Sequence, residues 1–209
     1  MKKVLQCITD VKQPSIIQLV EQRKKQFREL GKKDNDSLFK ELAFCILTAN
    51  YTAEGGMRIQ QEIGDGFIKL NEQQLAKRLK QLGHRFPNTR AKYIIEAREH
   101  KDSLQNIIRM KDKTAVREWF VGNVKGLGYK EASHFLRNIG FEDYAIIDFH
   151  IVDFLAEHGM IDAPKNKSMN KNKYLEIEDV LRSVAEKSGM GLGELDLYLW
   201  YCETGKILK

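Results

Sequence analysis

Apolar residues recur at intervals of three and four along most of the chain, and this periodicity constrains the fold more than any other feature. One segment shows the pattern with Ile16, Leu19, Val20 and Phe27, and a later segment with Leu175, Val180, Leu181 and Val184. This spacing forms one apolar stripe on a helix, whereas a half-buried strand alternates apolar and polar residues. No pair of convincing strand patterns and no internal repeat interrupts it. The sequence therefore predicts an all-α fold.

Glycines and capping residues divide this pattern into separate helices. Many of the helix-period segments are followed by a glycine, which adopts a left-handed C-cap at the lowest cost: Gly31, Gly64, Gly83, Gly140, Gly159, Gly189 and Gly205. Helix starts are expected at Pro14 for 14–30, after Asp36 for 38–49, at Asn71 with Gln74 as a capping box, and after Asp148 for 149–158.

Length and charge narrow the class of protein. A chain of 209 residues suits one compact unit or two small lobes. No apolar run approaches the ~20 residues of a bilayer span, and the first residues have no apolar stretch typical of a secretory signal. We therefore expect a cytoplasmic protein without membrane segments. The net charge of +6 permits a polyanionic partner without requiring one.

The chain has three cysteines, Cys7, Cys45 and Cys202, which are far apart and form no C-x-x-C pair. This pattern excludes a zinc module or a four-cysteine iron–sulfur cluster built from the chain alone. The odd number and wide spacing also argue against a disulfide framework.

A stretch rich in lysine and asparagine, PKNKSMNKNK at 164–173, contains a single apolar residue. Such a composition favours a solvated loop. The alternative is a segment that lies along the phosphate backbone of a nucleic acid.

The segment NVKGLGYKEASHFLRN at 123–138 is the most specific pattern in the chain, and it predicts a helix-hairpin-helix over about 117–139. Glycines at Gly126 and Gly128 allow positive φ and close approach of a backbone. The N–H groups of Gly126, Leu127 and Gly128, at the start of a helix, could cradle a phosphate. An ordinary αα-hairpin is the alternative. Polar groups on the next helix favour DNA binding: Ser133, His134 and Arg137.

Lys130 lies in the first turn of the second hairpin helix. A neutral amine there could attack C1′ of a sugar and form a Schiff base. Lowering its pKa from about 10.4 to near 7 requires about 4–5 kcal/mol, whereas the helix dipole supplies roughly 0.3–1 kcal/mol. Desolvation must supply the rest, so the hypothesis requires Lys130 to point into a closed cleft. An exposed lysine on a basic helix is the alternative.

Asp148 follows eighteen residues later, in YAIIDFHI. A helix of about 13 Å from Lys130, a reversal at Gly140 and an extended return of up to ~23 Å would bring its carboxylate back to the hairpin. There it could stabilise positive charge on the sugar or assist proton transfer. It is also the expected N-cap of the helix at Phe149. For His150, structural support is favoured over catalysis.

Longer segments extend this pattern over nearly the whole chain: CILTANYTAEGGMRIQ at 45–60, LGHRF at 82–86, KGLGYKEASHFLRNIG at 125–140, AIIDFHI at 145–151 and LDLYLWYCETGKILK at 195–209. Together, in this order and spacing, they resemble the helix-hairpin-helix DNA glycosylases with lyase activity. Within that superfamily they are similar to the small archaeal-type branch of 8-oxoguanine DNA glycosylase/AP lyase. One position departs from the family pattern, because Phe149 stands where Arg or Lys is usual and one cation near the DNA is lost.

The resemblance implies a two-lobed helical fold with a central DNA- and base-binding cleft, one lobe formed by 1–35 with 141–209 and the other by 36–140. The partner would be double-stranded DNA containing oxidised guanine, bound by a monomer that flips out the target nucleotide. No metal or redox cofactor is implied. Lys130 would be the Schiff-base nucleophile and Asp148 the catalytic carboxylate, and β-elimination would nick the strand. The glycine hairpin would hold a DNA phosphate.

A flipped base needs aromatic surfaces, and the candidates are Trp200 and Phe86, with a core position as the alternative for each. The resemblance places the C-terminal segment at the base pocket, which favours Trp200. Because 8-oxoguanine carries N7–H where guanine has an acceptor, the pocket requires a hydrogen-bond acceptor, which could be a backbone carbonyl. The terminal carboxylate of Lys209 is a further candidate acceptor, for the N1–H and N2 edge of the base.

Three other functions remain open from the sequence. The first is a non-catalytic helix-hairpin-helix DNA-binding module, and the second is a glycosylase specific for oxidised pyrimidines or alkylated purines. The third is a protein-binding helical bundle, which would leave Lys130, Asp148 and the glycine hairpin without a common explanation.

Overall fold

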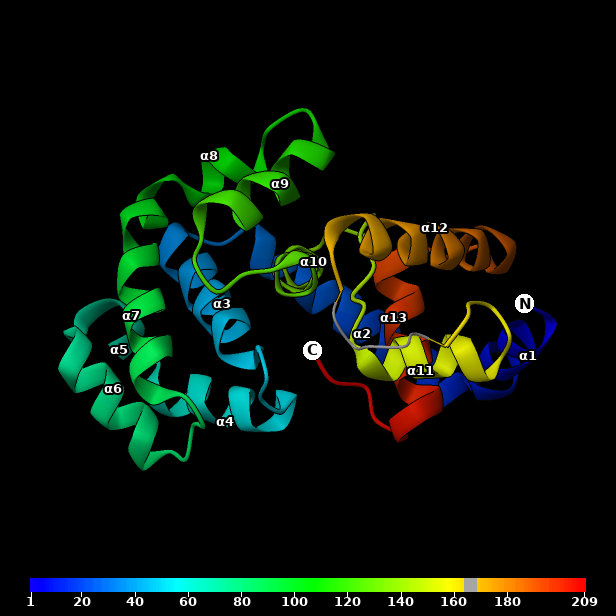
Figure 1. The fold of residues 1–209 in the computed structure, drawn as a ribbon, viewed down its shortest axis with the longest axis horizontal. Coiled ribbons are helices and arrows are strands. Elements are labelled where there is room, and N and C mark those ends of the chain that lie inside the picture. The colour runs from blue at the N-terminus through cyan, green and yellow to red at the C-terminus, as the bar shows by residue number, and fades with distance from the viewer. Residues whose placement is uncertain (164–168) are drawn as a thin grey trace. The chain divides into compact units, whose positions relative to one another are not determined.

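The computed structural model describes residues 1–163 and 169–209, and all regular elements in these ranges are helical, as predicted (Figure 1). The helices are α1 (Lys2–Val11), α2 (Pro14–Gly31), α3 (Asn35–Thr48), α4 (Ala53–Ile63), α5 (Gly66–Lys69), α6 (Glu72–Gln81), α7 (Pro87–Ala97), the 3-10 helix η1 (Arg98–Ser103), α8 (Leu104–Ile108), α9 (Lys113–Asn123), α10 (Tyr129–Asn138), α11 (Phe149–Glu157), α12 (Lys171–Ser188) and α13 (Leu192–Thr204). Among the described residues, no helix combines the length and apolarity of a membrane span.

The helix starts follow local capping chemistry. Asn71 and Gln74 form the predicted capping box at the start of α6, and α2 begins at Pro14 as expected. The prediction for α3 is wrong by a few residues. Its N-cap is Asp34, whose carboxylate accepts a hydrogen bond from the Ser37 N–H at 2.8 Å, and Asp36 lies in the first turn. A carboxylate in a first turn is favourable to the helix dipole, so both positions suit a helix start.

The prediction that a glycine with positive φ follows each of these helices is confirmed at most positions and wrong at one. Positive φ angles occur at Gly64, Gly83, Gly140, Gly159, Gly189 and Gly205. Gly31 instead is the last residue of α2, where a Cβ atom would lie 2.1 Å from the carbonyl oxygen of Ile139. Close approach of two backbones, rather than a left-handed cap, requires glycine at that position.

Contacts divide the chain into two compact units. Unit 1 comprises Met1–Glu29 and Gly140–Lys209, and unit 2 comprises Leu30–Ile139. The chain therefore leaves unit 1 near the end of α2 and returns to it after α10. Each unit has its own buried core, as expected for compact units of about 100 residues.

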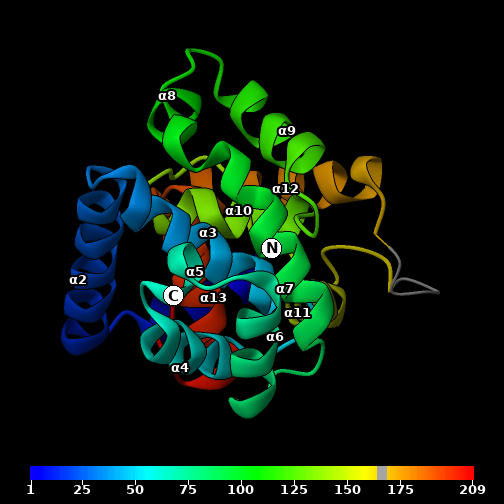
Figure 2. The ribbon, with the colours of Figure 1, turned by 90° about the vertical axis from the view of Figure 1, so that its left-hand side faces the viewer.

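Unit 2 is organised around α3. This helix is buried on nearly all sides, and it contacts α4, α5, α7, η1, α8 and α10. Figures 1 and 2 show the helices from α4 to α9 around it. A helix that is apolar around most of its circumference belongs at the centre of a helical unit, because every face must be covered. The sequence FKELAFCILT in α3 meets that requirement, with Glu41 as a buried exception.

Unit 1 is organised around α13, which contacts α1, α11 and α12. Leu195, Leu199 and Tyr198 are buried along this helix. The predicted loop at 164–173 falls partly outside the described residues, which omit 164–168. The expectation is wrong for its last three residues, since Lys171 begins α12 and the Asn170 side chain caps that helix by accepting the Lys173 N–H at 2.9 Å.

Candidate functional site

The predicted hairpin is present between α9 and α10 in unit 2. Gly126 has φ +87°, whereas Gly128 has φ −90° and forms the N-cap of α10, so only the first glycine uses positive φ. A Cβ atom on Gly126 would lie 2.5 Å from the ring of Tyr93. The hairpin thus lies directly against α7, and Gly126 is required both by its conformation and by this contact.

The start of α10 is held by Glu131. Its carboxylate accepts the Gly128 N–H at 3.2 Å, while the Leu127 N–H donates to the carbonyl of Val124 at 3.2 Å. Two of the N–H groups expected to cradle a phosphate therefore have partners within the chain. A phosphate at this hairpin must compete with the Glu131 carboxylate for the Gly128 N–H.

Lys130 lies in the first turn of α10, as predicted. Its side chain is 26% exposed, and its Nζ lies 3.8 Å from Oε1 of Glu131. Glu131 also interacts electrostatically with Arg90, a buried residue of α7. The amine is therefore half-buried at the surface of unit 2 beside a carboxylate that is held in place by the hairpin itself.

The structure contradicts the prediction that three side chains of α10 present polar groups to a phosphate. Ser133, His134 and Arg137 are all buried. Ser133 accepts a hydrogen bond from Arg117 at 3.2 Å, and His134 packs edge-on against Phe44 at 5.5 Å between ring centroids. The physical reason is the position of α10, which is buried from Ala132 to Asn138 and packs against α3 and α9.

Asp148 belongs to unit 1 and caps α11, as predicted. Its Oδ1 accepts the Ile151 N–H at 3.0 Å, which fixes the orientation of the carboxylate. The next two residues, Phe149 and His150, are exposed. The ring of His150 meets the ring of Trp200, on α13, edge-on at 5.7 Å. Unit 1 thus brings Trp200 close to the helix start that carries Asp148.

Two residues of α12 that the sequence analysis did not single out hold the segment before Asp148. Glu178 is buried and accepts the Ala145 N–H at 2.9 Å. The Tyr174 hydroxyl donates to the Ala145 carbonyl at 2.7 Å and accepts the Ile147 N–H at 3.2 Å. These side chains satisfy buried backbone groups of an extended segment that has no strand partner. A Glu within the apolar stripe of α12 was the signal that could have identified this support.

The three candidates for contacts with the flipped base are divided between the two units. Phe86 belongs to unit 2, where it precedes α7, is 38% exposed, and stacks under the guanidinium of Arg85 at 5.0 Å. Trp200 and Lys209 belong to unit 1. The indole Nε1 of Trp200 is shielded from solvent and has no hydrogen-bond partner among the described residues. Lys209 is half-buried at the end of the chain.

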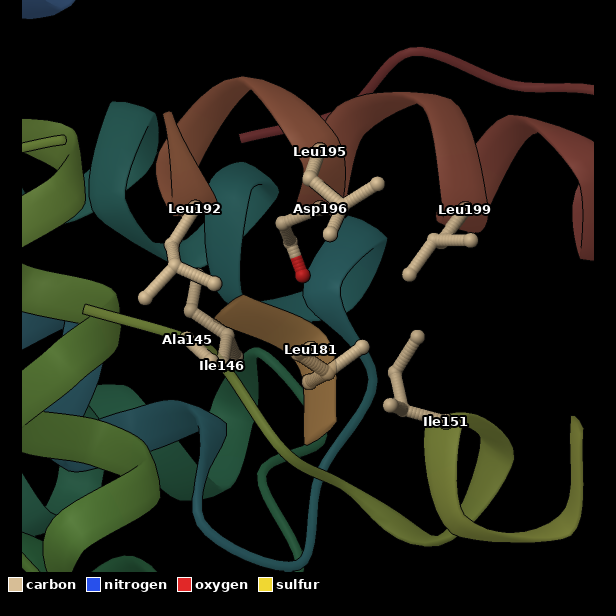
Figure 3. A pocket seen from close by; sticks show the side chains of 8 residues that line it. All are labelled: Ala145, Ile146, Ile151, Leu181, Leu192, Leu195, Asp196 and Leu199. Carbon is tan, nitrogen blue, oxygen red and sulfur yellow. The ribbon is translucent and has the colours of Figure 1, made fainter. Parts of the chain in front are cut away.

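Unit 1 also contains a small apolar pocket next to the segment before Asp148 (Figure 3). Its volume is about 10 Å³, which excludes a nucleobase. It is lined by Ala145, Ile146, Ile151, Leu181, Leu192, Leu195, Asp196 and Leu199. Among the residues that the structure describes, no cluster of three or more His, Cys, Asp or Glu side chains is arranged to hold a metal ion.

Comparison with known proteins gives a consistent result. The family model described as 8-oxoguanine DNA glycosylase matches residues 20–190. The 8-oxoguanine DNA glycosylase/AP lyase of Korarchaeum cryptofilum is 51% identical over 193 residues, which cover 92% of this chain and 91% of the relative. The protein of the same name from Methanocaldococcus jannaschii is 50% identical over 202 residues, which cover 97% of each chain.

Solved structures agree with this assignment. The Methanocaldococcus jannaschii 8-oxoguanine glycosylase/lyase in complex with a 15mer DNA containing 8-oxoguanine matches with a TM-score of 0.95 and 48% identity, over 99% of this chain and all of that one. The 8-oxoguanine DNA glycosylase of Thermotoga maritima matches with a TM-score of 0.93 and 45% identity, over 100% of this chain and 99% of that one. The chain belongs to the 8-oxoguanine DNA glycosylase family.

Proposed function

We propose that this protein excises 8-oxoguanine from double-stranded DNA and then cleaves the strand at the abasic site. The observation that carries the proposal is the hairpin of unit 2, which presents Lys130 at the start of α10 in a chain about half identical to relatives named for both activities. A glycosylase that only hydrolyses the base needs no amine, whereas a lyase requires one.

In the proposed reaction, the neutral amine of Lys130 attacks C1′ of the flipped nucleotide, and the bond to the base breaks. The resulting imine makes the C2′ proton acidic. Removal of that proton expels the 3′ phosphate and leaves a nicked strand. The position of Lys130 supports this role, because its side chain is 26% exposed in the first turn of α10, beside the hairpin.

Asp148 is proposed as the catalytic carboxylate that stabilises positive charge on the sugar as the base departs. Its capping bond to Ile151 supports this role by holding the carboxylate in one orientation. We infer that Glu178 and Tyr174 act as positioning residues for it, since they fix the backbone that leads to Asp148. A carboxylate that is already oriented needs no rearrangement during the reaction.

We propose further that the two units act as the two lobes around the DNA, and that the protein binds DNA as a monomer. The hairpin at Gly126, Leu127 and Gly128 would hold a phosphate through backbone N–H groups rather than through the buried side chains of α10. Trp200 is proposed to contact the flipped base. Phe86 and the carboxylate of Lys209 are further proposed contacts.

Borohydride trapping tests the nucleophile. The reagent reduces a protein–DNA imine to a stable amine, so a labelled duplex with 8-oxoguanine should become linked to the wild-type protein. Lys130→Gln should abolish the adduct and retain DNA binding. Lys125→Gln is the matched control, because Lys125 is exposed in the same hairpin and pairs with Glu96 at 3.1 Å. This variant should be trapped as the wild type is.

The same assay separates the alternatives. Duplexes that carry 8-oxoguanine, an oxidised pyrimidine, an alkylated purine or an abasic site should show the fastest base release with 8-oxoguanine. Trapping of the Lys130→Gln variant would show that another residue is the nucleophile. Salt-sensitive DNA binding without trapping on any duplex would identify a non-catalytic module.

A further inference from the structure

Two cysteines from opposite ends of the sequence meet in unit 1. Cys7 lies on α1 and Cys202 on α13, two helices that pack against each other, and the two side chains interact. This pair could not be predicted from the sequence, because the cysteine count is odd and the two positions are far apart. Both residues are free cysteines in the structure.

A separate contact shows that the meeting follows from how the two helices pack. The ammonium of Lys12, immediately after α1, lies 5.2 Å from the centroid of the Tyr198 ring on α13. Residue numbers rise along α1 as they fall along α13 between these two contacts, so the helices run antiparallel. The helices α1 and α13 also contact each other elsewhere in their packing. The packing of these two helices therefore brings Cys7 and Cys202 together.

The surroundings of the pair favour oxidation of Cys7 and Cys202 over oxidation of the third cysteine, Cys45. Both are half-buried, whereas Cys45 is completely buried in α3. Burial and the neighbouring Cys7 thiol raise the pKa of Cys202, which keeps its proton at neutral pH. Because the thiolate is the reactive form, Cys202 is expected to act as the second thiol, which attacks an already oxidised Cys7.

We propose that Cys7 and Cys202 form a redox modification site that closes into an intramolecular disulfide on exposure to peroxide. The sulfur of Cys7 attacks one peroxide oxygen, the O–O bond breaks, and a sulfenic acid and one water form. The sulfur of Cys202 then attacks the sulfenic sulfur, the S–O bond breaks, and a second water leaves with the Cys202 proton. The two thiols are oxidised to one disulfide and the peroxide is reduced to two waters.

The disulfide would act on a weakly anchored element. Of the ten residues of α1, only Val4 and Ile8 are buried. A helix of this length is marginal in isolation, so α1 depends on its contacts with α12 and α13. A covalent link to α13 would prevent α1 from detaching. It would also close nearly the whole chain into one loop, which restricts the unfolded state.

Peptide mapping of the oxidised wild-type chain tests the proposal directly. The protein is treated with hydrogen peroxide, denatured, alkylated and digested with trypsin. The expected product joins the peptide from Val4 to Lys12 with the peptide from Ser188 to Lys206, and Cys45 is alkylated. The midpoint of thermal unfolding should rise by roughly 10 °C and return on reduction. Neither measurement depends on DNA or on the proposed enzymatic activity.

Cys7→Ser and Cys202→Ser are the matched variants, and each should lose both the linked peptide and the change in unfolding temperature. Alkylation of all three cysteines after peroxide treatment of the wild type would overturn the proposal. A disulfide that forms only between two chains, or one that includes Cys45, would also overturn it.

Discussion

The start of α10 in unit 2 and the start of α11 in unit 1 carry the two proposed catalytic residues, and they are built in opposite ways. The hairpin before α10 lies against α7, and α10 is buried from Ala132 onward. The helix α11 begins with exposed residues, and the segment before it is held by two side chains of α12. The helix start that carries the amine is thus positioned by close backbone packing together with the Glu131 cap, whereas the one that carries the carboxylate depends on individual hydrogen bonds.

This difference determines where each region is sensitive to substitution. A backbone fixed by close packing tolerates no added atom at the contact. A segment fixed by side-chain hydrogen bonds loses its geometry when one buried partner is removed, because the orphaned backbone groups retain their desolvation cost. The following substitutions test that contrast.

The largest effect is expected at Asp148. Replacement by Asn keeps the cap, because the amide oxygen can accept the Ile151 N–H, but it removes the charge. We expect Asp148→Asn to slow base excision by about 10²–10⁴-fold with stability unchanged. Asp148→Ala should lose the same activity and in addition about 1 kcal/mol of stability. Single-turnover kinetics measure the loss of excision rate, and urea unfolding measures the loss of stability. Normal turnover of the Asn variant would show that Asp148 serves only as the N-cap of α11.

The next effect concerns Gly126. Alanine there would combine an unfavourable positive φ with a Cβ atom 2.5 Å from the ring of Tyr93, so we expect a loss of about 2–4 kcal/mol in unfolding free energy. Gly128→Ala is the control, because Gly128 has φ −90° and its Cβ atom would lie 3.3 Å from Glu131. This variant should lose less than about 1 kcal/mol. Equal losses at the two glycines would contradict the packing argument.

A smaller effect is expected at Tyr174. Tyr174→Phe keeps the ring but leaves the Ala145 carbonyl and the Ile147 N–H without the hydroxyl, at a cost of about 1–3 kcal/mol. The segment that leads to Asp148 should loosen, and excision should slow more than DNA binding weakens. Tyr201→Phe, a half-buried tyrosine of α13, is the matched control. If the Tyr174 variant loses stability without losing activity, the positioning role is wrong.

The smallest effect concerns Phe149, which is 44% exposed at the start of α11. Phe149→Lys restores a cation where the family usually has one. We expect DNA affinity to rise by about 3–10-fold at low salt, and the slope of log affinity against log salt to steepen by about 1. Phe149→Gln is the uncharged control. An equal gain in the two variants would exclude a phosphate contact.

Local patterns predicted the helices and the two helix starts that carry Lys130 and Asp148, because caps, glycine hairpins and apolar periodicity are properties of neighbouring residues. The burial of Ser133, His134 and Arg137 could not be predicted in this way. Polar residues after a glycine hairpin suggest an exposed face, whereas the packing of α10 against α3 and α9 depends on the whole of unit 2.

Contacts between distant segments were missed for the same reason. The support of Asp148 by Tyr174 and Glu178 joins α12 to a segment thirty residues earlier, and Cys7 meets Cys202 only because α1 packs on α13. The meeting of Lys130 with Asp148, which belong to different units, stays a prediction.

The contact between Gly31 and Ile139 places the two ends of unit 2 next to each other. A segment whose ends adjoin can be inserted into, or removed from, a host chain at a single point. Residues 30–139 therefore have the form of an inserted domain. If a short linker replaces this domain, Met1–Glu29 and Gly140–Lys209 should still fold. The inserted domain should also fold alone with its hairpin intact.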